Sequence, residues 1–413
     1  MTEQRTFVIV GAGLAGAKAA ETLREEGFTG RVVLIGAEPQ RPYERPPLSK
    51  GLLLGTAEPD SAYVHEPDWY DRHDVELRTG SAAHAVDRDR RRVRLAAGEE
   101  IGYDRLLLAT GARPRTLSVP GARLDGVHHL RTLADSERIA ADVHEGTRLV
   151  IIGAGWIGLE VAAAARARGA AVTVVETAPL PLHRVLGDRL ARFFADLHTG
   201  HDVRFHFGSG IREICGTATV SHVVLDDGTE LPADAVLVAV GVVPCTGLAE
   251  AAGLPVDNGI LVDHRLGTAD PHVFAAGDVA NVDHPLLGHR IRVEHWATAL
   301  HTGPVAARAM LGRPVTYDRL PYFFTDQYDL GMEYAGWVAP GAGTDLVVRG
   351  SLEDREFIAF WTRQGRVVAG MNVNVWEVTD QIQALIQAGL TTGATVAPDR
   401  LADPDVPLEA LLS

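Results

Sequence analysis

The chain has 413 residues, more than one ordinary domain holds, so we expect two or three domains that each bury a core. A formal net charge of −15 argues against nucleic acid and against an anionic membrane surface as partners. No apolar run reaches the ~18 residues that span a bilayer, and residues 1–6 do not resemble a signal peptide. We therefore expect a cytoplasmic protein that does not associate with membranes.

Neither a metal site nor thiol chemistry is expected from the composition. The two cysteines, Cys215 and Cys245, lack CxxC spacing and the density of a disulfide scaffold. The seventeen histidines are scattered, and pairs such as His128 and His129 have no cysteines or carboxylates at ligand spacing. We expect inert thiols and packing or surface histidines.

A nucleotide-binding turn is predicted at residues 7–16, which read FVIVGAGLAG. An apolar strand ends there in Gly11, Gly13 and Gly16, and a helix is expected over residues 14–26. Glycines let the backbone turn sharply and approach a pyrophosphate, which the helix N-terminus favours. A Gly-rich turn that binds no ligand is the alternative.

The next expected strand, residues 31–35, ends in Gly36, with Glu38 two residues later, and so departs from the simplest NAD pattern. The loop at residues 41–50 follows and reads RPYERPPLSK. Its three prolines stiffen the backbone that presents Lys50, one of only two lysines in the chain. A compact ammonium at this place suits a flavin N5 or a phosphate.

Short alternating strands over residues 75–95 predict a small sheet attached to the first domain. Five arginines between positions 88 and 94 form the densest cationic run, either on an ordinary exposed strand or on a docking surface. Two apolar strands that end in Gly111 and Gly241 are expected to carry the chain between two domains.

A second copy of the turn, LVIIGAGWIG, occupies residues 149–158, so two dinucleotides are expected. A helix over residues 157–168 leads into a strand at 171–175 that ends in Glu176. An acid there hydrogen-bonds the adenosine ribose hydroxyls and repels a 2′-phosphate, which predicts a preference for NADH over NADPH. A hairpin is expected at 226–228, where DDG supplies the turn.

The run HVFAAGDVA at residues 272–280 predicts a strand that ends at Gly277 and Asp278 ahead of a helix. Asp278 could accept hydrogen bonds from ribityl or ribose hydroxyls, or it could simply cap that helix. From residue 345 onward, three antiparallel strands (345–350, 356–361 and 366–373) and a helix at 378–388 are expected.

Taken together, the sequence motifs of this chain resemble those of a known protein family. Besides the two turns, the chain has ATG at 109–111, AAGD at 275–278, PYERPPLSK at 42–50, RVEHW at 292–296 and PYFFTDQYD at 321–329. It resembles, over essentially its whole length, the FAD-dependent NADH:ferredoxin reductases of bacterial oxygenase systems. This resemblance implies an α/β fold with two Rossmann-like dinucleotide-binding domains, as in glutathione reductase, and a C-terminal α+β domain. The implied boundaries are 1–112 with 244–318 for FAD, 113–243 for NAD and 319–413 for the C-terminal domain.

The resemblance also implies the cofactors, the partners and the site residues. FAD and NADH are the implied cofactors, and the implied partner is a [2Fe–2S] ferredoxin that serves a cytochrome P450 or a Rieske oxygenase. FAD would be bound by Gly11, Gly13, Ala15, Gly16, Ala37, Glu38, Arg45, Lys50, Ala83, Arg131, Asp278, Glu294, His295 and Trp296. NADH would be bound by Gly153, Gly155, Ile157, Gly158 and Glu176, with Glu160 beside the nicotinamide. Lys50 and Glu160 would be the catalytic residues, acting by charge and position rather than as acid and base.

Two residues depart from the family pattern. Phe324 stands where a tryptophan is usual, near the flavin on the path to the ferredoxin, and His295 replaces a small polar residue. There are three alternatives to this function, and Phe324 keeps the second of them open. The first is an NADH oxidase or a quinone or nitrite reductase component, and the second is a slow NADH-sensing flavoprotein that docks on a partner. The third, a flavin disulfide reductase, would need a cysteine near the flavin, which neither the 43–50 loop nor the first helix has.

Overall fold

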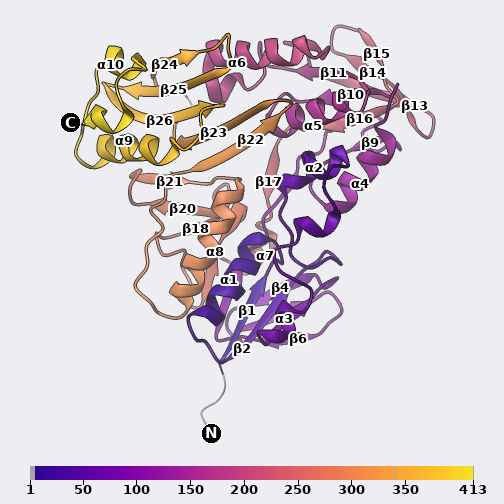
Figure 1. Cartoon of the computed structure of the whole chain (residues 1–413). Helices are drawn as coiled ribbons and strands as arrows, with labels where there is room; N and C mark the ends of the chain where they lie inside the picture. Colours follow the sequence, from indigo (N-terminus) through magenta and orange to yellow (C-terminus); the bar gives the residue numbers. More distant parts are fainter. Residues whose placement is uncertain (1–4, 340, 413) are drawn as a thin grey trace. The chain divides into compact units, whose positions relative to one another are not determined.

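The computed structural model describes residues 5–339 and 341–412, which form two compact units (Figure 1). Unit 1 contains the described residues up to Glu44, together with Asp60–Arg113 and Val243–Tyr322. Unit 2 contains Arg45–Pro59, Pro114–Val242 and the described residues from Phe323 onward. The chain passes between the units within β8 (Ala112–Pro114) and β17 (Val242–Pro244).

A five-stranded parallel sheet in the order β19-β7-β1-β2-β3 forms the centre of unit 1. Its strands are short apolar runs, as expected for a sheet that is buried on both faces. Helix α1 (Leu14–Glu25) follows the first strand and packs beside α8 (Trp296–Met310), as Figure 1 shows. The strands are β1 (Thr6–Val10), β2 (Arg31–Ile35), β3 (Val75–Arg78), β7 (Arg105–Leu108) and β19 (Val273–Ala275).

Two three-stranded sheets flank this centre within unit 1. One contains β4 (Ala83–Asp87), β5 (Arg92–Leu95) and β6 (Glu100–Gly102). The other contains β18 (Ile260–Val262), β20 (Ala280–His284) and β21 (His289–Ile291). The short helices of this unit are α3 (Trp69–Arg72) and α7 (Gly247–Ala251).

Two sequence predictions for unit 1 are wrong. Residues 75–78 were expected in the small sheet, but β3 pairs in parallel register with β2 and extends the main sheet. The helix expected after Asp278 is only the 3₁₀ turn η3 (Gly277–Val279), which leads into strand β20. Val282 favours a strand, and β20 finds partner strands on both sides in β18 and β21.

Four strands in the first half of unit 2, in the order β12-β11-β10-β16, repeat the order β3-β2-β1-β7 of unit 1, whereas the edge strand β9 precedes β10 in the chain and β19 follows β7. The parallel sheet of this half runs β12-β11-β10-β16-β9, and β10 is the strand that leads into the second Gly-rich turn. Gly228, at φ +90°, lies in the predicted hairpin between β14 and β15. The elements are β9 (Val127–His128), α4 (Leu133–Asp142), β10 (Arg148–Ile152), α5 (Trp156–Ala167), β11 (Ala171–Glu176), α6 (His183–Gly200), β12 (Arg204–Phe207), β13 (Ile211–Gly216), β14 (Val220–Leu225), β15 (Glu230–Pro232) and β16 (Ala235–Val238).

The second half of unit 2 is an antiparallel sheet of order β22-β23-β26-β25-β24, with α9 packed against β23 and β26 (Figure 1). The elements are β22 (Tyr322–Gln327), β23 (Leu330–Gly336), β24 (Asp345–Ser351), β25 (Glu356–Arg363), β26 (Arg366–Val373), α9 (Thr379–Thr391), α10 (Pro398–Ala402) and η4 (Leu408–Leu412). The three expected strands and the helix are confirmed, and β22 and β23 are additional.

One apolar core joins both halves of unit 2 and reaches the proline-rich loop. Trp156 packs against Phe323 with ring centroids 5.1 Å apart, and Phe193 packs against Phe357 at 5.2 Å. The loop folds into η1 (Pro46–Ser49) and α2 (Gly51–Leu54), which contact α4 and α5. Leu53 is fully buried in this core, so packing as well as proline fixes the backbone around Lys50.

Candidate functional site

The first Gly-rich turn in unit 1 leaves space that a ligand could fill. A Cβ added to Gly11, whose φ is +121°, would lie 2.0 Å from the carbonyl oxygen of Ala109, and one on Gly16 would lie 2.0 Å from that of Gly11. Gly13 differs, because no described atom lies within 4 Å of its added Cβ. No side chain caps α1, and its first turn has no acid. These uncapped N–H groups and the open space at Gly13 fit a pyrophosphate.

The turn that carries Asp278 lies beside the first fingerprint in unit 1. The backbone N–H of Gly277 donates to Thr302 Oγ1 at 2.9 Å, and a Cβ added to Gly277 would lie 3.2 Å from Cβ of Ala15. On α8, a Cβ at Gly303 would lie 2.3 Å from the carbonyl oxygen of Ala15. Thr302 and Gly303 thus fix this arrangement, although the sequence analysis did not single them out; a glycine inside a helix was the available signal.

Packing explains why Gly36 follows β2. A Cβ there would lie 2.6 Å from Cβ of Ala12 in the fingerprint turn, so the end of this strand is pressed against the turn. Glu38, one of the implied FAD contacts, accepts a hydrogen bond from Tyr43, and its carbonyl accepts one from the N–H of Gly80 at 2.8 Å. Ala37 is exposed between Gly36 and Glu38, and Ala83 begins β4.

The segment 294–296 enters α8, with His295 in extended backbone at the N-cap position. Glu294 forms an ion pair with Arg292, which also donates to the carbonyl of Asp278 at 3.3 Å. Desolvation lowers the pKa of His295 to about 4, and Asp278 only partly opposes this effect. The imidazole of His295 is therefore neutral at physiological pH.

The second Gly-rich turn, in unit 2, repeats the geometry of the first. A Cβ on Gly153, whose φ is +103°, would lie 2.5 Å from the carbonyl oxygen of Ala239, and one on Gly158 would lie 2.2 Å from that of Gly153. Gly155 again faces space without a described atom within 4 Å. Helix α5 has no side-chain cap and no acid in its first turn, and the side chain of Ile157 is 46% exposed.

Glu176 lies at the end of β11 and turns toward the second fingerprint. One carboxylate oxygen accepts from the N–H of Ala154 at 2.8 Å, and the other accepts from the N–H of Ala178 at 2.8 Å and from Thr177 at 3.1 Å. The negative charge is thereby fixed next to the Gly-rich turn, where the ribose of a dinucleotide would lie.

Lys50 and Glu160, which lie far apart in the sequence, meet inside unit 2. Lys50 Nζ donates to Glu160 Oε1 at 2.8 Å and lies 5.3 Å from the centroid of the Phe324 ring. The carboxylate also accepts hydrogen bonds from Ser49 and, at 2.6 Å, from Thr325. Glu160 is buried, with 5% of its surface exposed. A buried carboxylate with three donors is held in one place, and it fixes the ammonium beside it.

The remaining predicted flavin contacts of unit 2 also meet. The guanidinium of Arg45 donates to the backbone carbonyl of Arg131. Arg131 precedes Thr132, which begins α4 with a capping box that includes Asp135. Ser136 on that helix donates to the carbonyl of Leu48 at 2.8 Å, so α4 anchors the proline-rich loop.

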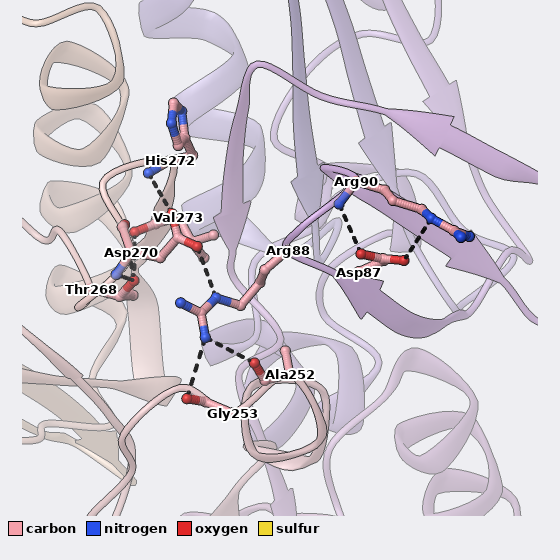
Figure 2. A network of polar contacts seen from close by, with 9 residues as sticks. All are labelled: Asp87, Arg88, Arg90, Ala252, Gly253, Thr268, Asp270, His272 and Val273. Atoms are coloured by element: carbon pink, nitrogen blue, oxygen red, sulfur yellow. Dashed lines mark hydrogen bonds and ion pairs between the residues drawn. The ribbon is translucent and has the colours of Figure 1, made fainter.

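One residue of the arginine run, Arg88, has a structural role, whereas the other four arginines are exposed. Arg88 donates to Asp270 at 2.8 Å and to the carbonyl oxygens of Ala252 at 3.1 Å and Gly253 at 3.4 Å (Figure 2). These bonds tie the turn after β4 to the turn after α7 and to the loop before β19. Arg90 pairs with Asp87, as the same figure shows, and Arg92 pairs with Glu100 at 3.1 Å on the neighbouring strand.

The described residues hold no cluster of three or more His, Cys, Asp or Glu side chains suited to a metal ion. Cys215 lies in β13 and Cys245 directly follows β17, so neither belongs to a Gly-rich turn or to the proline-rich loop. Over residues 5–339 and 341–412, no helix is long and apolar enough to cross a membrane.

Comparison with known proteins identifies the family. Residues 5–303 match the pyridine nucleotide-disulphide oxidoreductase model, and residues 322–412 match the reductase C-terminal model. The ferredoxin–NAD(+) reductase component of an anthranilate 1,2-dioxygenase system from Burkholderia cepacia is 40% identical over 98% of this chain and 99% of its own.

Solved structures agree with this match over nearly the whole chain. The ferredoxin reductase for the CYP199A2 system of Rhodopseudomonas palustris has a TM-score of 0.93 and 38% identity, covering 99% of this chain and 100% of its own. A covalent putidaredoxin reductase–putidaredoxin complex has a TM-score of 0.92 and 36% identity, covering 98% of each chain. The α/β fold expected from the sequence is confirmed, and the chain belongs to the pyridine nucleotide-disulphide oxidoreductase family, among its ferredoxin reductases.

Proposed function

We propose that this protein is an FAD-dependent NADH:ferredoxin reductase, which takes a hydride from NADH and passes single electrons to a [2Fe–2S] ferredoxin serving a cytochrome P450 or a Rieske oxygenase. The observation that carries this proposal is the pair formed by Lys50 and the buried Glu160 in the unit that also holds the second Gly-rich turn. The named functions of the relatives, which are reductases of oxygenase systems, support the same reaction.

FAD is assigned to the first fingerprint and NADH to the second. The open space at Gly13 and at Gly155, each before an uncapped helix N-terminus, supports these two assignments. The predicted domains (1–112 with 244–318, 113–243 and 319–413) and the predicted FAD and NADH contacts remain our proposal. The preference for NADH depends on Glu176, and a cytoplasmic location remains a prediction from the sequence.

FAD, when bound, supplies the conversion between the two-electron chemistry of NADH and the one-electron chemistry of an iron–sulfur cluster. The protein residues contribute binding, orientation and charge. Lys50 supplies a fixed positive charge, which stabilises negative charge that develops nearby. Glu160 holds that ammonium and the adjoining chain in place, and no protein nucleophile or general base is required.

The electron acceptor distinguishes this proposal from its rivals. An NADH oxidase, or a quinone or nitrite reductase component, would use the same first half-reaction, and a slow NADH sensor would bind a partner without rapid transfer. Phe324, which replaces the usual tryptophan and lies beside Lys50, keeps these alternatives open. A disulfide reductase is opposed by the positions of Cys215 and Cys245, outside both fingerprints.

The cofactor assignments can be tested by flavin content and by anaerobic reduction with NADH. The purified protein should contain about one FAD per chain and should be bleached by NADH. Gly13→Ala should remove FAD, whereas Gly155→Ala should keep FAD and weaken NADH binding, because each added methyl group fills the space of one pyrophosphate. A protein without flavin, or equal effects of both variants on FAD content, would contradict the assignments.

A further inference from the structure

A chain of buried polar side chains in unit 2 leads away from Glu160. Thr325 lies 2.6 Å from Glu160 Oε1, Gln327 Nε2 lies 3.2 Å from Thr325 Oγ1, and Gln327 Oε1 lies 2.8 Å from Nε2 of His198. The hydroxyl of Tyr328 then lies 3.1 Å from Nδ1 of His198. Two residues of β22, Thr325 and Gln327, and one residue of α6, His198, thus connect the Lys50–Glu160 pair to Tyr328.

The carboxylate of Glu160 sets the direction of every hydrogen bond in this chain. An ionised carboxylate only accepts, so the Thr325 hydroxyl must donate to it and must itself accept from the amide nitrogen of Gln327. The amide oxygen of Gln327 therefore faces His198, which must donate from Nε2. Burial lowers the pKa of His198 to about 4, so the ring is neutral, and its unprotonated Nδ1 accepts from the Tyr328 hydroxyl.

All four hydrogen bonds point toward the carboxylate, and bonds aligned in this way strengthen one another. The chain does not conduct protons readily, because the amide of Gln327 lies in its middle and is too weak an acid and base to release or accept a proton near neutral pH. Its physical effect is orientation: Thr325 is held with its hydroxyl hydrogen on Glu160, and His198 is held in one tautomer.

Two observations indicate that this network serves more than packing. Thr325, Gln327 and His198 are each no more than 1% exposed, and apolar residues of similar shape would fill the same space without needing hydrogen-bond partners. Tyr328 also has a φ of +57° in the turn after β22, a conformation that bulky residues rarely adopt. Its ring stacks on His201 with centroids 3.6 Å apart, which keeps the hydroxyl directed at His198.

We propose that Thr325, Gln327, His198 and Tyr328 are positioning residues that fix the Glu160 carboxylate, and through it the Lys50 ammonium, for flavin reduction by NADH. This inference rests on the proposed function, which places that pair at the flavin and the nicotinamide. It adds four residues to the site, none of which belongs to a nucleotide fingerprint.

The test compares Thr325→Val, which keeps the shape but removes the hydroxyl, with the matched variant Thr325→Ser, which retains it. In stopped-flow reduction by NADH, Thr325→Val should lower the limiting rate roughly tenfold, the size expected for losing one hydrogen bond to a charged group. The Kd for NADH should stay the same, and Thr325→Ser should restore most of the rate. Tyr328→Phe, three hydrogen bonds away from Glu160, should have a smaller effect in the same direction.

A second readout does not depend on activity. In ¹⁵N spectra of the FAD-loaded protein labelled at histidine, the His198 signal, assigned by its loss in His198→Gln, should report the Nε2–H tautomer. In Thr325→Val this single tautomer should be lost, because Gln327 can then turn over.

Three results would overturn the inference: an Nδ1–H tautomer in the wild type, an unchanged limiting rate in Thr325→Val, or a Thr325→Ser variant as slow as Thr325→Val. A wild-type flavin that NADH does not bleach would instead refute the proposed function, and the positioning role would fall with it. The tautomer measurement would still report on the chain, so the two failures are distinguishable.

Discussion

Removing the negative charge of Glu176 should change which nicotinamide nucleotide reduces the flavin. Its two carboxylate oxygens are fixed by the N–H groups of Ala154 and Ala178, each at 2.8 Å, so the charge cannot swing away from a ligand in the second turn. The 2′-phosphate of NADPH would meet this charge, whereas the 2′-hydroxyl of NADH would find a hydrogen-bond acceptor.

The size of the effect follows from Coulomb's law. Two unit charges about 5 Å apart, at an effective dielectric constant of about 20, repel by about 3 kcal/mol, or about a hundredfold in affinity. Glu176 is only half-buried, and solvent screening reduces this value. We therefore expect the wild type to favour NADH by roughly ten- to a hundredfold in the ratio of limiting rate to Kd, and Glu176→Gln to lose most of that ratio.

The assay is stopped-flow flavin reduction at a series of NADH and NADPH concentrations, at low and at high salt. Because Glu176 also holds the backbone of the second turn, Thr177→Ala serves as the control: it removes a neighbouring hydrogen bond of 3.1 Å and leaves the charge in place. If the wild type reduces equally well with both nucleotides, or if Glu176→Gln leaves the ratio unchanged, the reasoning is refuted.

Three further predictions concern other parts of the molecule. Gly11→Ala should prevent folding of unit 1, because its methyl group would lie 2.0 Å from a carbonyl oxygen, whereas Gly13→Ala should fold with a thermal midpoint near that of the flavin-free wild type. Phe324→Trp, which introduces the tryptophan that the family resemblance implies beside Lys50, should speed electron transfer to a ferredoxin without changing reduction by NADH; an unchanged transfer rate would exclude this position from the electron path. Burial raises the pKa of Asp270, but the hydrogen bonds from Arg88 and from the backbone N–H of His272, together with the charges of both residues, outweigh burial, so the pKa is lowered overall. The resulting stability is present above pH ~4 and is lost as pH falls through the lowered pKa. Arg88→Met should reduce the free energy of unfolding, measured by urea titration, by about 1–3 kcal/mol at neutral pH. This free energy should also fall less steeply in the variant as the pH is lowered, and the same pH dependence as in the wild type would contradict this account.

The fold and both nucleotide turns were predictable because their signals are local. Each fingerprint lies within ten residues and is recognised by its own spacing, although the contacts that require Gly11 and Gly153 are made with Ala109 and Ala239, which are distant in the sequence. The positions of Glu176 and of the C-terminal strands follow from periodicity in the same way. These features were sufficient to predict the correct fold class.

Features that depend on distant partners were not predictable. The role of β3 is set by its pairing with β2, and strand β20 replaced an expected helix because β18 and β21 flank it. The chain from Glu160 to Tyr328 joins three separate segments, and only folding reveals that Thr325 and Gln327 share a strand face with His198 opposite.

The arginine run at residues 88–94 is a further case in which the role of a residue depends on partners that are distant in the sequence. As sequence it was compatible with a docking surface, yet Arg88 is committed to Asp270 and to two backbone carbonyls within unit 1. Charge clustering in sequence therefore says little about surface potential until the partners of each charge are known.

The central claim, electron transfer from NADH to a ferredoxin, is tested most directly by following reoxidation of the NADH-reduced protein. The reduced flavin would be mixed, in a stopped-flow instrument, with a panel of [2Fe–2S] ferredoxins and, separately, with oxygen alone. The account predicts that at least one ferredoxin is reduced far faster than the flavin reacts with oxygen, in single-electron steps. Reoxidation by oxygen or quinone only, with every ferredoxin left oxidised, would contradict it and would assign the protein to the oxidases or to the slow NADH sensors.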